Sequence, residues 1–460
     1  MPNPESKSSA QQEKRPATPA VSGCFSDGTI MELVYHPEEP ATAFALWRDG
    51  RWSIERDYGL PSGERLIPFS PNNNVIKNDV VVLPSRPVEY GTKSELVADL
   101  RRFLHRYLDV SPAFETIAAH YVLFTWVYDA FNEVPYVRFQ GDFGTGKTRA
   151  LLVVGSLCYK GFFASGASTV SPLFHILDAF RGTLILDEAD FRFSDEKTEI
   201  VKILNNGNVR GVPVLRTMIN RHREFNPQAF QVFGPKVVAM RGSYDDRALE
   251  SRFLTEIMGN AALRGDIPIN LPSGMREEAL ALRNKLLLFR FRNRNTIRLN
   301  GAVDLDSVAP RISQILTPLL SIIEDPTAKD ALRAAATSAD EMLVAERGLS
   351  SEAQLLEIIR ELSGEAHKFV LPIGEIADRF GARFRHEYER PITPRWVGGI
   401  LRRRLHLAPY KSHGRFVLSL DPARLNALYE RYGITGATLV TLYPWKSEGG
   451  EGDVGTTLPI

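Results

Sequence analysis

The spacing of hydrophobic and polar residues changes along the chain and divides it into segments. Short β-branched and aromatic runs, broken by Pro, Gly and Asn, predict a β-rich accessory module over 25–91. From residue 92 onward the apolar residues recur at helical spacing, and a second, more apolar helix is predicted over 114–131. Residues 1–24 are rich in Pro, Ser, Gln and charge, which predicts a disordered tail.

A strand, a helix and a second strand are predicted in the middle of the chain. Residues 134–139 are β-branched and aromatic, and 149–159 carries apolar residues at helical spacing. A second apolar strand over 182–186 leads directly into two carboxylates, Asp187 and Glu188. Ligands of open α/β sheets bind at the carboxyl ends of the strands, so these segments predict an α/β fold with a ligand site there.

The stretch between the first strand and the helix reads GDFGTGKT, which is the pattern G-x-x-x-x-G-K-[ST] of a phosphate-binding loop. Backbone N–H groups in such a loop point at phosphate oxygens, and the helix that follows adds its positive N-terminal end. The predicted ATP-binding residues are Gly141, Asp142, Phe143, Gly144, Thr145, Gly146, Lys147 and Thr148.

The two carboxylates complete the predicted chemistry. Asp187 and the hydroxyl of Thr148 are predicted to hold Mg²⁺, and Glu188 is predicted to be the base that activates the attacking water. If Glu188 is not the base, Asp190 is the next candidate. A buried strand that ends in solvated acids is the alternative for these carboxylates alone, but the loop upstream favours the catalytic interpretation.

The residues that follow predict a β-hairpin with a charged tip. Extended segments flank the polar residues 220–224, although Pro213 and Pro227 weaken the prediction of strands. A further apolar strand over 236–240 precedes Arg241 and Ser243. These two residues occupy the place of a polar γ-phosphate sensor, but no Asn or Thr ends the strand, so the assignment of a sensor stays open.

Three arginines later in the chain are candidates for contacts with phosphate. Arg247 and Arg252 lie at a predicted helix start, where an arginine could reach the ATP of a neighbouring copy, and we place Arg252 first. An ordinary surface salt bridge is the alternative. Arg311 begins a helix after a proline and is a candidate sensor that folds over the nucleotide. It lies in a predicted helical lid over 256–346, whose basic run over 285–298 is interpreted as a solvated face.

A separate domain is predicted over 351–432. Three helices followed by a hairpin with a glycine turn match the order of a winged helix-turn-helix. The segment between residues 383 and 415 contains nine basic residues and two acids, which gives a local charge of +7. A basic surface of this kind gains affinity for DNA by releasing the counterions of the phosphates. A protein-docking role is the alternative. The predicted DNA-binding residues of this domain are Arg395, Arg402, Arg403, Lys411 and Arg415.

Composition limits the remaining possibilities. The 460 residues have a formal charge of only +1, so any nucleic-acid surface must be local. The two cysteines, Cys24 and Cys158, form no metal or disulfide pattern, which fits a reducing compartment. No run of eighteen apolar residues and no signal peptide is evident. A cytoplasmic protein without a membrane partner is expected, and residues 444–460 are predicted to be a second disordered tail.

Five segments in this order resemble a known family: GDFGTGKT, LILDEAD, KILNNGNVRGVPVLR, FGPKVVAM and DDRALESRF. They are similar to the AAA+ ATPases of phage and mobile elements, which include helicase-like proteins of the superfamily-3 and primase-helicase type. The resemblance covers roughly residues 93 to 330 and implies an α/β AAA+ core over 92–255. The letters DEAD occur at 187–190, but no Ser-Ala-Thr motif or second RecA-like core follows, which argues against a DEAD-box RNA helicase.

The resemblance also implies partners and roles. Such ATPases assemble as rings, usually hexamers, with ATP and Mg²⁺ between subunits, and Arg252 matches the arginine that acts on a neighbour's nucleotide. Arg221, His222 and Arg223 match the tip of a hairpin that tracks single-stranded DNA in the pore, whereas duplex DNA is expected at the winged helix. The leading hypothesis is a ring-forming DNA motor for a mobile element. The alternatives are an ATP-switched initiator or loader that does not unwind DNA, and a protein-remodelling ATPase.

Overall fold

The computed structural model describes residues 17–166, 168–187, 195–219, 225–244, 246–259, 264–299, 305, 308–348, 350–366, 370–388 and 391–434. The chain divides into two compact units, 1–340 and 341–460. The division falls within helix α10, which spans Pro326–Gly348.

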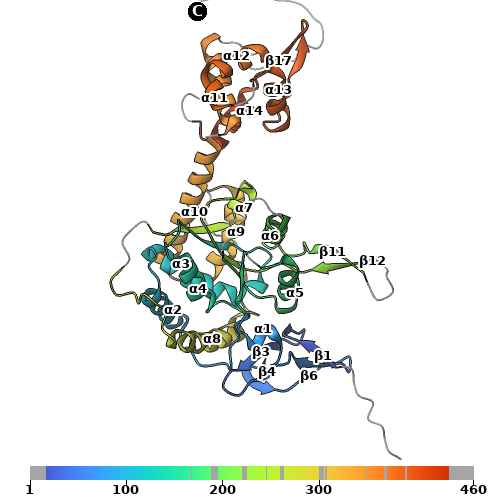
Figure 1. Ribbon diagram of the computed structural model, residues 1–460, viewed down its shortest axis with the longest axis vertical. Helices are drawn as coiled ribbons and strands as arrows, with labels where there is room; N and C mark the ends of the chain where they lie inside the picture. The colour runs from blue at the N-terminus through green and yellow to red at the C-terminus, as the bar shows by residue number, and fades with distance from the viewer. Residues whose placement is uncertain are drawn as a thin grey trace, which may run out of the picture. The chain divides into compact units, whose positions relative to one another are not determined.

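The first unit begins with the β-rich module, drawn in blue in Figure 1. One sheet is antiparallel with the order β2-β3-β4-β5, and the other has the order β1-β7-β6. The strands are β1 (Ala17–Ala20), β2 (Ser22–Cys24), β3 (Ile30–His36), β4 (Ala41–Arg48), β5 (Arg51–Glu55), β6 (Tyr58–Gly59) and β7 (Arg65–Pro68), followed by helix α1 (Asn74–Lys77).

Two of these strands correct a prediction. Strands β1 and β2 lie inside 1–24, the segment that composition predicted to be disordered. They are ordered because β1 pairs with β7 and β2 pairs with β3. Composition reports only on the segment itself and does not reveal partners elsewhere in the chain.

Two helices lead into the core. Helix α2 (Lys93–Tyr107) begins with a capping box between Thr92 and Glu95, and helix α3 (Pro112–Thr125) begins with the Ser111 side chain as its cap. Helix α3 is mostly apolar and is buried on all sides from Phe114 onward, so it lies inside the unit. The short helix η1 (Tyr128–Ala130) follows it.

A five-stranded parallel sheet forms the centre of the first unit, with the order β14-β8-β13-β10-β9. A mixed α/β fold with a parallel sheet is therefore present, as the sequence predicted. The strands are β8 (Tyr136–Gln140), β9 (Phe162–Ser165), β10 (Leu184–Asp187), β13 (Lys236–Met240) and β14 (Phe253–Ile257), and the helices are α4 (Lys147–Gly155), α5 (Val170–Phe180), α6 (Asp195–Asn206) and α7 (Arg247–Glu250).

Parallel pairing gives this sheet two chemically different edges. Tyr136 pairs with both Lys236 and Phe253, so β8, β13 and β14 start together, and they also finish together at Gln140, Met240 and Ile257. We call the finishing side the carboxyl edge and the starting side the amino edge. Five strand residues span roughly 16 Å, so a short side chain at one edge does not reach the other.

The predicted hairpin is present. Strand β11 (Val214–Ile219) pairs antiparallel with β12 (Phe225–Phe230), and Pro227 lies within β12 opposite Thr217. In Figure 1 this two-stranded ribbon projects from the body of the unit near α5 and α6. Its tip, residues 220–224, lies outside the described residues.

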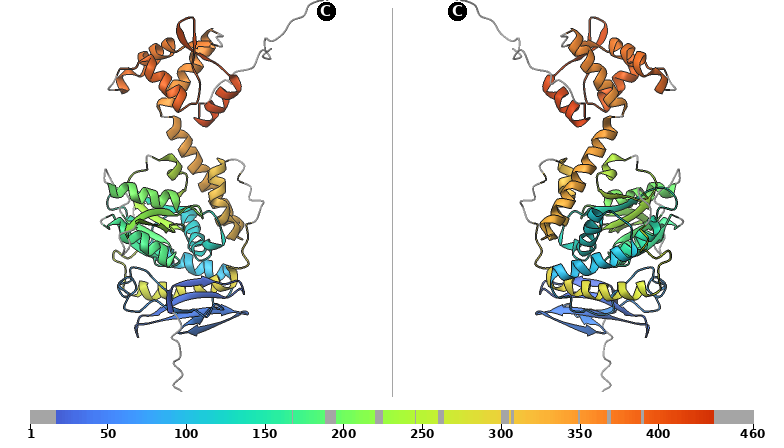
Figure 2. Two further views of the ribbon diagram at one scale, coloured as in Figure 1. Left: turned by 90° about the vertical axis from the view of Figure 1, so that its right-hand side faces the viewer. Right: turned by 90° about the vertical axis from the view of Figure 1, so that its left-hand side faces the viewer.

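Helix α8 (Gly274–Asn293) lies between the β-rich module and the rest of the first unit, as Figure 2 shows. Phe291 stacks on Trp47 of β4, and the Arg283 guanidinium donates to the carbonyls of Leu83 and Ser156. Sequence analysis placed this segment in a lid and its arginines on a solvated face. The structure corrects the second point for Arg290, which is buried, whereas Arg292 of the same run is exposed.

The second unit is a small helical domain with its own sheet. Its elements are α11 (Ser351–Ala366), β15 (Val370–Pro372), α12 (Ile373–Phe384), η2 (Arg385–Glu387), α13 (Pro394–Arg403), β16 (Tyr410–Ser412), β17 (Arg415–Ser419) and α14 (Pro422–Arg431). The three strands are antiparallel in the order β15-β17-β16. One apolar core joins the helices and the sheet. Before it, α9 (Pro310–Ile322) and most of α10 belong to the first unit.

Candidate nucleotide-binding site

The glycine-rich loop leaves the carboxyl edge of β8 and enters α4. Gly144 and Gly146 have φ of 79° and 90°, a left-handed conformation that favours glycine. Gly146 is the N-cap of α4 and makes no side-chain cap, so the first amides of the helix lack a side-chain acceptor there. The local geometry therefore matches the predicted phosphate-binding loop. Phe143 projects from it with 88 % of its surface exposed.

The loop is held closely by the segment that follows β14. A Cβ atom on Gly141 would lie 2.7 Å from the carbonyl oxygen of Met258, and one on Gly259 would lie 2.5 Å from Cγ2 of Thr145. The Met258 N–H also donates to the Gln140 carbonyl at 2.6 Å. These close approaches require glycine at both positions, because any side chain would force backbone apart.

Lysine, threonine and aspartate meet at this edge. The Lys147 ammonium donates to the carbonyls of Gly141 at 2.7 Å and Asp142 at 2.6 Å. The Thr148 hydroxyl donates to Oδ2 of Asp187 at 2.8 Å, although the two residues are 39 positions apart. A hydroxyl beside a carboxylate is a pair of hard oxygen donors, so these residues fit Mg²⁺ and a polyphosphate next to Lys147.

Sheet topology puts this group where ligands of α/β proteins bind. After β8 the chain passes over β13 and β10 to reach β9, whereas after β13 it crosses β8 to reach β14. These connections leave neighbouring strands in opposite directions, so a crevice opens between β8 and β13 at the carboxyl edge. The loop after Gln140 and the segment after Met240 border that crevice.

Gln140 is a residue that the sequence analysis missed. As the last residue of β8, it donates from Nε2 to the Arg241 carbonyl at 3.4 Å and to the Ser243 hydroxyl at 3.5 Å. It therefore links the phosphate loop to the predicted sensor segment. The only signal in the sequence was an amide side chain at the end of an apolar strand. Glu188, the predicted base, and Asp190, its substitute, lie outside the described residues.

Arg252 lies at the amino edge, at the opposite end of the sheet from the loop of its own chain. It immediately precedes β14, is 7 % exposed, and donates to the carbonyl of Leu204 and the amide oxygen of Asn205. Burial lowers the pKa of its guanidinium. In this conformation Arg252 caps the end of α6 and does not present its charge at the surface.

Arg247 has the opposite surroundings. It begins α7, is exposed, and its side chain has no partner among the described residues. An arginine that reaches another chain needs an exposed guanidinium, which favours Arg247 over Arg252 as the candidate. Arg247 meets that condition and Arg252 does not.

Arg311 is not close to the loop of its own chain, which corrects its prediction as a sensor. It begins α9 and lines a cavity of about 490 Å³ together with Arg252, Glu133 and Asn205. These neighbours all belong to the amino edge, because Glu133 precedes β8 and Arg252 precedes β14. A proline followed by a polar residue indicates where a helix starts. This pattern does not show which edge of the sheet the helix contacts.

The predicted DNA-contacting residues fall in two places. Arg221, His222 and Arg223 lie at the hairpin tip, outside the described residues. The hairpin arm itself carries an exposed Leu215 and an Arg216 that pairs with Glu199 and lies 4.0 Å above the Phe174 ring. These contacts anchor the arm on α5 and α6.

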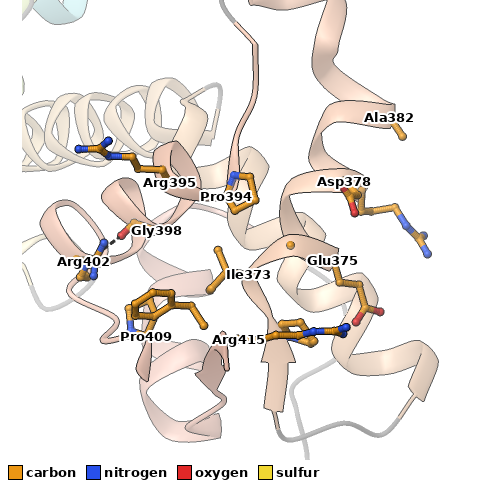
Figure 3. A pocket seen from close by; sticks show the side chains of 14 residues that line it. Ile373, Glu375, Asp378, Ala382, Pro394, Arg395, Gly398, Arg402, Pro409 and Arg415 are labelled. Carbon is orange, nitrogen blue, oxygen red and sulfur yellow. Dashed lines mark hydrogen bonds between the residues drawn. The ribbon is translucent and has the colours of Figure 1, made fainter. Parts of the chain in front are cut away.

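The basic residues of the second unit are solvent-exposed. Arg395, Arg402, Arg403, Lys411 and Arg415 are all exposed, and none has an acidic partner in the described part of the chain. Arg402 donates from Nε to the Gly398 carbonyl at 3.2 Å, shown dashed in Figure 3. In contrast, Arg404 pairs with Glu352 at 2.8 Å.

A cavity of about 940 Å³ lies between α12, α13 and the β16–β17 hairpin. Figure 3 shows Arg402 of α13 on one side of it and Glu375 and Asp378 of α12 on the other. Because both charge signs line it, the cavity itself does not match a phosphate backbone. The exposed arginines of α13 and of the β16–β17 hairpin, which have no acidic partner among the described residues, do match a phosphate backbone.

The described residues contain neither a ready-made metal cluster nor a membrane-spanning helix. No group of three or more His, Cys, Asp or Glu side chains there could hold a metal ion by itself. Within the same residues, no helix has the length and apolar character needed to cross a membrane.

Comparisons with known proteins do not show a family. No protein-family profile matches the chain, and no curated protein matches it. Among solved structures, the NrS-1 C-terminal region is similar at 12% identity over 85% of this chain and 97% of that one, with a TM-score of 0.36. JCV helicase is 16% identical over 58% of this chain and 65% of that one, with a TM-score of 0.23. Cdc6p from Pyrobaculum aerophilum is 13% identical over 70% and 92%, with a TM-score of 0.17.

Proposed function

We propose that the protein is an ATP-hydrolysing motor of AAA+ type that acts on DNA as a ring. The observation that carries the ATPase part is the contact between Thr148 and Asp187 beside Lys147, at the crevice of a parallel sheet. ATP and Mg²⁺ would supply the phosphoryl group and the charge that neutralises it. The loop amides and Lys147 would bind phosphate, and Glu188 would take the proton from water.

The ring is supported by the separation of the arginines from the loop. Arg252 precedes β14 at the amino edge, and Asp246, next to Arg247, accepts from the same Asn205 that contacts Arg252, so both arginines lie away from the loop at the carboxyl edge. An arginine that assists hydrolysis from this position must come from a neighbouring copy. A ring satisfies this requirement for every copy, and a hexamer is the expected number.

DNA as the substrate is supported by two features. The β11–β12 ribbon projects from the first unit, with a basic tip in its sequence. In the second unit, the order helix, strand, helix, helix, strand, strand is that of a winged helix, and five of its arginines and lysines are exposed without acidic partners. We expect the ribbon to contact single-stranded DNA and the winged helix to contact duplex DNA.

The ATPase proposal is tested by two substitutions. Lys147→Ala should lose nucleotide binding, whereas Glu188→Gln should bind ATP but hydrolyse it very slowly, because only water activation is removed. Radiolabelled ATP binding and phosphate release measure the two steps separately. Normal hydrolysis by Glu188→Gln would assign the base to another carboxylate, with Asp190 next.

The motor proposal is tested on forked DNA. Strand separation and ATP hydrolysis should rise with single-stranded DNA in the wild type and stay at background in Glu188→Gln. No stimulation and no separation would reject the motor. Site-specific footprinting without unwinding would instead identify an initiator or loader, which the exposed basic residues of the second unit also suit. Binding that falls steeply with salt separates both from a protein-docking role.

A further inference from the structure

A second charged cavity lies at the amino edge, away from the phosphate loop. It has a volume of about 380 Å³, within the usual range of small-molecule sites. Strand β2, helix η1, the end of α5, both ends of the β11–β12 ribbon and helix α8 contribute to it. It is lined by Ser22, Gly23, Cys24, Tyr128, Asp129, Tyr159, Arg181, Arg210, Gln231, Phe233, Arg290 and Arg294.

Asp129 is the one acid among the described residues that line the cavity, and it is already neutralised. Arg290 donates to both oxygens of Asp129, at 2.7 Å and 2.9 Å, and Arg294 donates to Oδ2 at 3.2 Å. These arginines hold the pKa of the Asp129 carboxyl well below its usual range, although burial opposes them. Arg290 is 2 % exposed and also binds the buried Glu32 at 2.7 Å. This fixed network forms the charged base of the cavity.

Two further arginines keep donors for a ligand. The Arg181 side chain makes one weak contact, from Nε to the Asp178 carbonyl at 3.4 Å. Arg210 donates from Nε and Nη2 only to the backbone carbonyls of Asp129 and Phe131. Among the described residues neither guanidinium has a carboxylate partner. Four arginines around one acid leave the cavity with a strong excess of positive charge.

Aromatic rings form the apolar part of the same cavity. The rings of Tyr128 and Phe233 are 5.7 Å apart, and the Arg210 guanidinium lies 4.8 Å from the Phe233 centroid. The Arg290 guanidinium lies 4.6 Å from the Tyr159 centroid. Guanidinium groups recognise phosphate through paired N–H donors, and rings stack on a base. The two together suit a phosphate attached to a nucleoside.

The backbone at Arg181 is also unusual. Arg181 ends α5 with φ of 49°, a left-handed conformation that a residue with a side chain adopts at a cost. The Tyr128 hydroxyl donates to its carbonyl at 2.5 Å and fixes that position. Glycine is the residue that usually occupies such a helix end. An arginine there keeps a guanidinium at the cavity despite the less favourable backbone.

We propose that this cavity is a second phosphate-binding site, which takes a nucleotide through Arg181 and Arg210 and is separate from the Gly141–Thr148 loop. The nucleotide is either free or one unit of a DNA strand, since both offer the same phosphate and base. Arg210 precedes β11 and Phe233 follows β12, so a ligand here contacts both ends of the ribbon at its base.

Cys24 reports occupancy of this cavity. It is exposed and lines the cavity, whereas Cys158 is buried, so a thiol reagent should modify Cys24 alone. The rate of that modification is measured in full-length Lys147→Ala protein, in which the other phosphate site is disabled. The probes are thymidine monophosphate, a short oligothymidylate, and uncharged thymidine as the control. We expect a phosphate-bearing probe to slow the reaction and thymidine to leave it unchanged.

Arg181→Gly tests the assignment without weakening the fold, because glycine relaxes the left-handed backbone. Its unfolding temperature should equal or exceed that of the parent protein. The probe concentration that protects half of the Cys24 thiol should rise about tenfold or more, because the substitution removes a charge-assisted hydrogen bond to the phosphate. Arg86→Ala, an equal charge change at an exposed arginine outside the cavity, should leave it unchanged.

Each outcome decides the proposal. Protection by thymidine monophosphate that depends on Arg181 supports a free nucleotide as ligand. Protection by the oligothymidylate alone, with the same dependence, supports a DNA strand. Absence of protection by both probes, or protection that Arg181→Gly leaves unchanged, overturns the site.

Discussion

Two lysines, one at each edge of the five-stranded sheet, have opposite surroundings. At the carboxyl edge Lys147 extends from a partly exposed loop and rests on two backbone carbonyls. At the amino edge Lys236 is fully buried, and its ammonium donates to the carbonyls of Val232 and Gly234 at 2.9 Å and 2.8 Å. Arg252 is buried beside it at the end of α6. Both lysines donate to backbone carbonyls, but only Lys147 lies near water.

That difference separates residues that can bind a ligand from residues that support the fold. A cation near water can exchange a carbonyl for a phosphate at low cost, whereas a buried one has no alternative partner. Burial, together with the charge of the nearby Arg252, accordingly lowers the pKa of Lys236 to about 7. Exposure thus distinguishes Arg247 and Arg181 as candidate ligand contacts from Arg252 and Arg290 as structural residues.

The comparison predicts different losses for Arg247 and Arg252. Arg247→Ala should lower the rate of ATP hydrolysis about a thousandfold and leave ATP binding intact, because it removes transition-state charge stabilisation. Arg252→Ala should mainly lower the unfolding midpoint in urea. Steady-state phosphate release and urea titration measure the two effects.

A mixing experiment completes this test. If Arg247 acts on a neighbour's nucleotide, mixtures of Arg247→Ala and Lys147→Ala chains should regain part of the activity, because some interfaces then have an intact arginine and an intact loop. No recovery at any mixing ratio would place Arg247 outside a shared site.

Arg290→Met should have the largest effect on stability. It removes one cationic partner from the buried Glu32 carboxylate and one from the partly exposed Asp129 carboxylate, and breaking a buried pair typically costs about 3 to 5 kcal/mol. Arg292→Met, two residues away, removes an exposed arginine that pairs with Glu89, and should cost under about 1 kcal/mol. Equal losses in urea unfolding would refute the structural role of the buried network.

The buried lysine predicts a specific dependence on pH. Above about pH 7 the folded protein holds Lys236 neutral, whereas the unfolded chain keeps it protonated until near pH 10. The unfolded state then binds more protons, so stability should rise with pH across this window by about 1.4 kcal/mol per unit from this group. Lys236→Met should lack this rise. If the unfolding free energies of the wild type and the variant changed in parallel between pH 7 and 9, the prediction would be contradicted.

Gly141→Ala should give the smallest free-energy change of the predicted effects. The added Cβ would meet the Met258 carbonyl at 2.7 Å and displace the loop from the segment after β14. We expect ATP to bind about tenfold more weakly, from about 1 to 2 kcal/mol of backbone strain. Gly265→Ala, where no atom lies within 4 Å of the added Cβ, is the matched control. Unchanged affinity in Gly141→Ala would show that the loop accommodates a side chain.

Local chemistry made the phosphate loop predictable from the sequence. Its glycines, Lys147 and Thr148 act through backbone geometry within eight consecutive residues, and the strand before Asp187 was evident from its apolar run. Helix and strand spacing also predicted the hairpin and most helices of the second unit. Strand β15 and helix α14 were not predicted, because β15 has three residues and depends on pairing with β17.

Long-range pairing explains most of the failures. Arg290 was interpreted as part of a solvated basic face, yet its partners Glu32 and Asp129 are 258 and 161 residues away. Arg311 was expected above the nucleotide but lies beside Arg252, since helix spacing does not say which edge of a sheet a helix meets. Burial of a charge depends on such distant partners, and no local pattern records them.

Strand β14 has a mechanical consequence for an assembled ring. It starts at Phe253, next to Arg252 at the amino edge, and ends at Ile257, and the turn residues Met258 and Gly259 that follow it touch the glycine-rich loop. The strand therefore connects the two edges of the sheet directly. If the proposed ring forms, a shift at the amino edge of one copy would reach that copy's own loop through this strand.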